Sequence, residues 1–134
     1  MTGWRDVVVA AAMLGAISFA STPFAAEVSF ESDLMPTLKR RCGACHITGE
    51  EPGKMALIPG QAYAALVNQP SVEAEGMLRV TPGDPGQSYL IHKLEGTHAD
   101  VGGSGARMPF HQGPLPAKQI LQFRDWISAG APDN

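Results

Sequence analysis

Cys42-Gly43-Ala44-Cys45-His46 is the stretch that decides how this chain of 134 residues folds. Two cysteines separated by two residues and followed directly by a histidine are typical of the covalent attachment of a c-type haem. The two thiols add across the two vinyl groups of the porphyrin as thioethers, and the imidazole of the next residue then lies under the iron. The motif therefore predicts Cys42 and Cys45 as attachment sites and His46 as the proximal iron ligand.

Other interpretations of the motif remain open. A thioredoxin-like dithiol expects a strand before it, whereas residues 34–41 look helical. A structural zinc site needs four protein ligands, but His92, His98 and His111 are scattered along the chain. A disulfide within the motif would close so small a loop that it would constrain the unfolded chain little. Haem attachment is the favoured prediction.

The first residues have the layout of a secretory signal peptide. Residues 1–5 form a short segment with one basic residue, residues 7–20 are apolar and rich in small side chains, and residues 21–26 combine small residues with a proline. An acidic Asp6 weakens the positive start slightly. The apolar run is too short to cross a bilayer comfortably, so it indicates a cleaved export signal.

This layout predicts a signal peptide over residues 1–26 and one domain over residues 27–134. Cleavage after Ala20 and cleavage near Ala26 both satisfy the preference for small residues, and an uncleaved membrane anchor is the alternative. Because haem c is normally attached only after export, we expect a periplasmic protein.

Composition limits the classes of partner and the size of the core. The formal net charge of −3 gives no basic surface of the kind that nucleic acid binding requires. The length beyond the signal suits one small domain, in which haem would supply much of the core. Both cysteines of the chain lie in the motif, so haem attachment leaves none for a structural disulfide.

Hydrophobic spacing predicts an all-α fold of about four helices. Ser32 or Asp33 can cap a first helix that runs to about Arg41, and its apolar residues recur at four-residue spacing up to Cys42. No segment resembles a strand of convincing length. The other expected helices cover residues 61–68, residues 87–94, ending before Gly96, and residues 116–129, with Pro116 at the start and Gly130 as the cap.

The sixth iron position separates electron carriers from proteins that bind ligands at the iron. Met108 is the best candidate, because it follows a glycine-rich stretch and precedes Pro109, which stiffens the backbone. An ordinary core methionine is the plainer interpretation of the same residue. The alternative ligands are Met77, His92, His98 and His111.

Two groups of basic residues have both a functional and a plain interpretation. Arg107 can pair with a haem propionate through its fork of donors, or simply face solvent. The run Lys39-Arg40-Arg41 can steer an acidic redox partner, or simply complement the C-terminal end of a helix.

A hydrogen bond from its second ring nitrogen should orient the imidazole of the proximal histidine. Iron-binding histidines usually donate their second ring nitrogen to a carbonyl or carboxylate. For His46, we expect the carbonyl of Pro52 or Pro59 to accept this hydrogen bond.

Residues 30–134 resemble a short monohaem c-type cytochrome domain. The resemblance implies thioethers at Cys42 and Cys45, iron ligation by His46 and Met108, a small bundle of helices wrapped around the haem, and a first helix that crosses the last. The segments that carry it are Leu38 to His46, Pro82-Gly83-Asp84-Pro85 with Ser88, Leu90, Lys93 and Leu94, Arg107-Met108-Pro109, and Gln119-Ile120 with residues 126–131.

Two departures from the family pattern concern the ends of the Met108 segment. Leu115-Pro116 replaces the polar cap usual before the last helix, and Phe110-His111 puts a further candidate ligand next to Met108.

The expected function is that of an exported electron-transfer protein with one covalent haem c and its iron, and not of an enzyme. Its partners would be redox proteins, with no nucleic acid, and with no membrane unless the N-terminal segment stays uncleaved. The alternatives are a haem sensor or small haem enzyme with a displaceable sixth ligand, and a fixed cytochrome subunit of a larger oxidoreductase.

Overall fold

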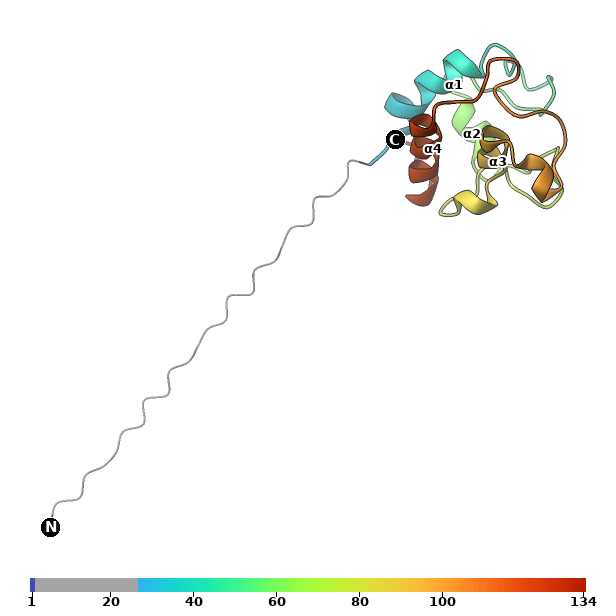
Figure 1. The fold of residues 1–134 in the computed structure, drawn as a ribbon. Coiled ribbons are helices and arrows are strands. Elements are labelled where there is room, and N and C mark those ends of the chain that lie inside the picture. Colours follow the sequence, from blue (N-terminus) through green and yellow to red (C-terminus); the bar gives the residue numbers. More distant parts are fainter. Residues whose placement is uncertain (2–26) are drawn as a thin grey trace.

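The computed structural model describes Met1 and residues 27–134, and Figure 1 shows their arrangement. Apart from Met1, the predicted signal peptide over residues 1–26 lies outside the described residues. The described part of the chain is all-α, as predicted, and its β-type pairing is limited to isolated bridges. Within residues 27–134, no helix is both long and apolar enough to cross a membrane.

The first helix begins earlier than predicted. A π-helical turn, η1 (Phe30–Leu34), leads directly into α1 (Met35–Arg41). Ser29, and not Ser32 or Asp33, is the cap: its side chain accepts a hydrogen bond from the amide of Ser32, 3.2 Å away. Asp33 reciprocates by accepting from the amide of Ser29 at 2.8 Å. This exchange satisfies two amides that the helix itself leaves free.

The second helix is shorter than predicted. It covers only α2 (Ala62–Leu66), because the backbone becomes extended at Val67. Val67 forms an isolated parallel bridge with Val80, and the amide of Val80 donates to the carbonyl of Leu66 at 3.2 Å. Pairing with a distant segment therefore ends the helix that local spacing would have continued.

The last two α-helices agree closely with the expected ones. α3 (Tyr89–Glu95) ends at Gly96, whose φ of 82° is the left-handed conformation that glycine favours. α4 (Ala117–Ser128) is preceded by Pro116, which occupies the cap position instead of the first helical position. Two short 3₁₀ turns flank α3, namely η2 (Pro85–Gln87) and η3 (His98–Val101).

One hydrophobic core joins the first and last helices. α4 packs against η1 and α3, and Trp126 is completely buried beside Phe30, at 5.1 Å between ring centroids. Burial of an aromatic or aliphatic side chain of this size stabilises a fold by roughly 1.5–3 kcal/mol. Leu34 and Leu38 from the first helix, and Phe123 and Ile127 from α4, all belong to this core.

The C-terminal tail returns to the start of the first helix, as Figure 1 also shows. The backbone carbonyl of Asn134 accepts hydrogen bonds from the amide of Glu31 and from the hydroxyl of Ser29, both at 2.9 Å. Tyr63 donates to the carbonyl of Ala131 at 2.9 Å. The tail therefore closes the core on the side of the first helix.

Candidate functional site

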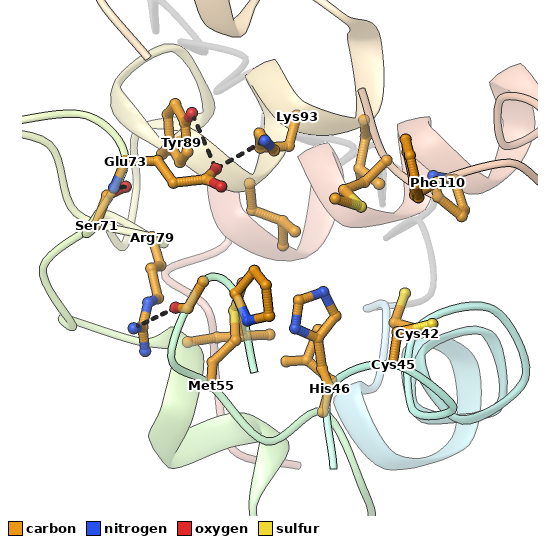
Figure 2. Close-up of a pocket in the computed structure, with 18 of the residues that line it drawn as sticks. Cys42, Cys45, His46, Met55, Ser71, Glu73, Arg79, Tyr89, Lys93 and Phe110 are labelled. Atoms are coloured by element: carbon orange, nitrogen blue, oxygen red, sulfur yellow. Dashed lines mark hydrogen bonds and ion pairs between the residues drawn. The ribbon is translucent and has the colours of Figure 1, made fainter. Parts of the chain in front are cut away.

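A largely apolar cavity lies between the motif and the segment that carries Met108 (Figure 2). Cys42, Cys45, His46 and Met108 all line it. The cavity volume that the centre of a water molecule can reach is about 200 Å³. A single water needs roughly 10–15 Å³ of such volume. The cavity therefore suits a ligand much larger than a few waters.

The end of α1 delivers both cysteines to the cavity. The amides of Cys42 and Gly43 both donate to the carbonyl of Leu38, at 2.9 and 2.8 Å, and those of Cys45 and His46 donate to the carbonyl of Cys42 at 3.0 and 3.1 Å. These tight turns bring the two cysteine side chains together beside the His46 ring (Figure 2). A Cβ on Gly43 would lie 3.1 Å from two backbone carbonyl oxygens, so glycine suits this close packing.

His46 is buried and faces the cavity, with only 8% of its surface exposed. Burial lowers the pKa of its imidazole, which favours the neutral form that binds metals. Its Nδ1 atom is buried without a hydrogen-bond partner, so neither Pro52 nor Pro59 supplies the expected carbonyl. A buried polar atom is normally paired, so this Nδ1 is an exception, and the hydrogen bond expected to orient the ring is not formed.

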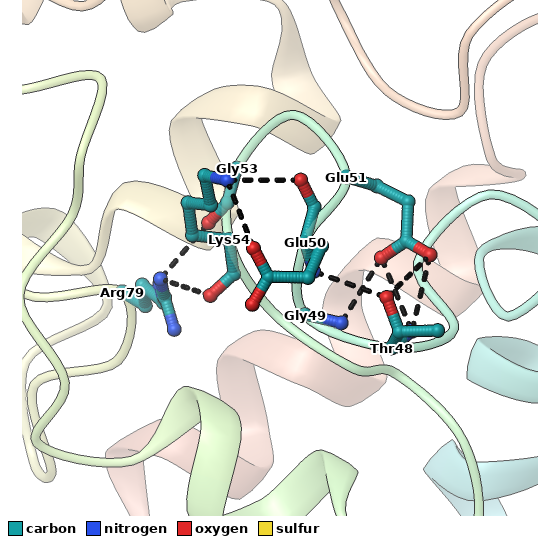
Figure 3. A network of polar contacts seen from close by, with 7 residues as sticks. All are labelled: Thr48, Gly49, Glu50, Glu51, Gly53, Lys54 and Arg79. Atoms are coloured by element: carbon teal, nitrogen blue, oxygen red, sulfur yellow. Dashed lines mark hydrogen bonds and ion pairs between the residues drawn. The ribbon is translucent and has the colours of Figure 1, made fainter.

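The loop after His46 is shaped by one carboxylate (Figure 3). Glu51 accepts hydrogen bonds from the amide and hydroxyl of Thr48, at 3.1 and 3.0 Å, and from the amide of Gly49 at 3.0 Å. Hydrogen bonds from backbone amides, first that of Glu51 itself, lower the pKa of this carboxyl to about 2. The loop that covers the His46 side is thus held by contacts between near neighbours in sequence.

Arg79 ties this loop to the rest of the domain. Its guanidinium donates to the carbonyls of Gly53 and Lys54, both at 2.9 Å, and to that of Ala65 at 2.7 Å. Arg79 also lines the cavity. Sequence reasoning missed it, and the available signal was a single arginine between the apolar residues Leu78 and Val80.

Met108 lines the cavity from the segment between η3 and α4. Its side chain is half-buried, its backbone amide donates to the carbonyl of Lys93 at 2.9 Å, and its peptide bond to Pro109 is cis. A second methionine, Met55, also lines the cavity and lies next to His46 in Figure 2. Sequence reasoning did not consider Met55.

A polar cluster occupies the cavity wall away from the cysteines (Figure 2). Lys93 pairs with Glu73 at 2.7 Å, with 8% and 22% of the two side chains exposed, and donates to the carbonyl of Ser104 at 3.1 Å. The Tyr89 hydroxyl lies 3.3 Å from both Glu73 and that carbonyl. Burial and then the Glu73 charge raise the pKa of Tyr89 to about 12, so it stays a hydrogen-bond donor.

The polar cluster fixes the glycine-rich segment before Met108. A Cβ on Gly103 would collide with the Tyr89 hydroxyl and lie 2.7 Å from the carbonyl oxygen of His98. Lys93 and Tyr89 were not identified as site residues from the sequence, although their four-residue spacing puts them on one face of α3.

Arg107 is not brought to the cavity. Its Nε donates to the carbonyl of Leu94 at 3.0 Å, and the side chain lies over Gly96 at the end of α3. A cation suits this position, because the last carbonyls of a helix carry partial negative charge. The geometry gives no support to the expected pairing of Arg107 with a propionate.

The alternative ligands do not line the cavity either. Both ring nitrogens of His92 have partners, the hydroxyl of Thr97 at 2.8 Å and the carbonyl of Gly86 at 2.9 Å. His98 contacts the carbonyl of Gly105 at 3.0 Å. His111 is exposed and its ring lies against that of Phe110, 3.9 Å between centroids. Met77 is absent from the cavity wall as well.

The position of Cys42 does not favour a redox-active dithiol. Such sites lower a thiol pKa, commonly at a helix N-terminus, whereas Cys42 caps the C-terminal end of α1. Burial raises the pKa of its thiol to about 11. Among residues 27–134, no group of three or more His, Cys, Asp or Glu side chains is arranged to hold a metal ion.

Comparison of the chain with protein-family models, with curated proteins and with solved structures found no match.

Proposed function

We propose that this chain is a monohaem c-type cytochrome that transfers electrons. Cys42 and Cys45 would carry the haem as thioethers, and His46 and Met108 would bind the iron. The observation that carries the proposal is that these four residues, the last from a distant part of the sequence, line a single cavity.

Three features of the cavity support haem as its occupant. The wall is mainly apolar, as a porphyrin face requires, and the His46 ring is buried, which favours the neutral form that can bind iron. The polar cluster of Glu73, Tyr89 and Lys93 lies away from the cysteines, and both Lys93 and Arg79 line the cavity. Because Arg107 does not line the cavity, Lys93 and Arg79 are better placed than Arg107 to receive the haem propionates.

Electron transfer follows from this ligand set. A haem held by these residues would supply one-electron chemistry at its iron, and a methionine ligand would raise its potential relative to two histidines. The residues of the chain would hold the group, exclude water and provide His46 and Met108 as its two protein ligands, so that little reorganises when an electron moves. They make and break no bond in a substrate. We therefore propose partner redox proteins as donor and acceptor, and an exported, periplasmic location.

The test is an optical spectrum of the matured protein, first oxidised and then reduced. We expect covalently bound haem and the weak red-edge band of methionine sulfur on ferric iron. Met108→Ala should abolish that band, whereas Met55→Ala, the matched change of the other cavity methionine, should retain it. Loss of the band in Met55→Ala alone would overturn the ligand assignment.

The same preparation separates the alternative functions. Rapid binding of carbon monoxide to the ferrous protein would favour a sensor or a small haem enzyme, because it requires an open or easily displaced sixth ligand. Absence of haem from a protein matured with a haem-attachment system would overturn the proposal as a whole.

A further inference from the structure

Arg41 and Gln112 form a reciprocal contact between α1 and the segment that follows Met108. The guanidinium donates to the side-chain oxygen of Gln112 at 3.0 Å and to the carbonyls of Gln112 and Gly113 at 3.2 and 3.3 Å. In return, the amide nitrogen of the Gln112 side chain donates to the carbonyl of Arg41 at 3.1 Å. We call this set of hydrogen bonds the Arg41–Gln112 clasp.

The clasp lies beside the cavity and connects the motif to the segment that carries Met108. Arg41 immediately precedes Cys42, and Arg41 and Gln112 both line the cavity. The chain from η3 to α4 passes the C-terminal end of α1 in Figure 1, where the clasp joins them. The contact therefore connects the attachment motif directly to the segment that carries the second axial ligand.

Met108 is held on both sides as a result. Before the cavity, its own amide is bonded to the carbonyl of Lys93. After it, Pro109 is buried, Phe110 and His111 are exposed, and His111 has a φ of 57°, so the clasp supplies the next hydrogen bonds to a distant segment. A non-glycine residue in this conformation is locally unfavourable and persists only where the surroundings hold it.

We propose that Arg41 and Gln112 are positioning residues that keep the Met108 thioether on the iron. The inference rests on the proposed function and adds to it a specific device for retaining the ligand. It also changes the interpretation of the basic run: Arg41 is committed to the clasp, while Lys39 and Arg40 remain exposed. Arginine suits the role because its planar fork can donate to several acceptors at once.

The experiment measures how easily imidazole displaces methionine from the ferric protein. Gln112→Ala and Arg41→Lys each remove clasp hydrogen bonds, and Arg41→Lys keeps the charge. We expect the affinity for imidazole, followed by loss of the methionine band, to rise about tenfold in each, as the loss of about 1.4 kcal/mol of net hydrogen bonding would produce. Arg40→Ala is the matched control on the same helix and should leave the affinity unchanged.

Further results distinguish the inference from the ligand assignment on which it rests. The double variant should exceed neither single variant by much, because the two residues act as a unit. A lowered melting temperature with unchanged imidazole affinity would mean a merely structural contact and would overturn it. Haem without a methionine band in the wild type would instead overturn the ligand assignment. In that case, hydrogen exchange of the amides of residues 110–113 still tests the clasp. Unchanged exchange in Gln112→Ala would show that the clasp does not hold this segment.

Discussion

The two walls of the cavity are built in different ways. The His46 wall consists of the motif and the loop after it, where Glu51 bonds to residues two and three positions away. The Met108 wall is held almost entirely by distant residues, since Ser104 meets Lys93 and Gln112 meets Arg41. The first wall is therefore shaped mainly by contacts within one continuous stretch of sequence, to which Arg79 adds hydrogen bonds from outside, whereas the second exists only in the folded domain.

The largest expected effect comes from breaking the His46 wall at its thiols. Cys42→Ala combined with Cys45→Ala should eliminate covalent haem completely, because no other cysteine exists in the chain. Haem staining after denaturing electrophoresis measures this directly. Met108→Ala should retain the stain, since the thioethers do not depend on the other wall. Covalent haem in the double variant would refute the attachment sites.

A smaller effect, on stability, is expected from removing the Lys93–Glu73 ion pair of the Met108 wall. Lys93→Met should lower the free energy of unfolding by about 1–3 kcal/mol, because it leaves the mostly buried Glu73 carboxylate without its partner. Lys54→Met is the control: its pair with Glu50 is exposed and spans 3.4 Å, so about 0–1 kcal/mol is expected. Urea unfolding curves provide both values, and equal losses would contradict the difference between the walls.

The smallest effect concerns the carboxylate in the His46 wall. The pKa of Glu51 is lowered from 4.5 to about 2, so its stabilising contribution is complete above pH 4.5 and is lost as the pH falls through about 2. Glu51→Gln should therefore melt below the wild type at pH 7, and the gap should narrow towards pH 2. Thermal unfolding at several pH values measures this gap. A gap independent of pH would assign the loss to packing instead.

Helix positions were largely predictable, because local spacing and caps determine them. α3 ends at Gly96 and α4 covers almost the expected residues. The start of the first helix was wrong because the reciprocal bonding of Ser29 and Asp33 extends it by a turn. The end of α2 was wrong because Val67 pairs with Val80, which no local pattern contains.

The difference between local and distant contacts also explains which site residues were predictable. Turns among adjacent residues place Cys42, Cys45 and His46 together, so the grouping of these three residues follows from the sequence. The roles of Arg79 and Glu73 depend on carbonyls and cations brought to them by the fold, so the position of Arg79 between apolar residues was a signal too weak to assign its role. Haem attachment, methionine ligation and the cytochrome resemblance remain predictions that the spectra described above will test.

The contacts of Asn134 place the last residue beside the start of the first helix. Its backbone carbonyl meets Glu31 and Ser29 at hydrogen-bond distance, so a short linker can join residue 134 to residue 29 without crossing the core. Tolerance of circular permutation depends on such neighbouring ends and on exposed sites for new ones. A permutant opened near the exposed Gly60 would then separate the motif from α2 in the chain while every contact described for the core is kept.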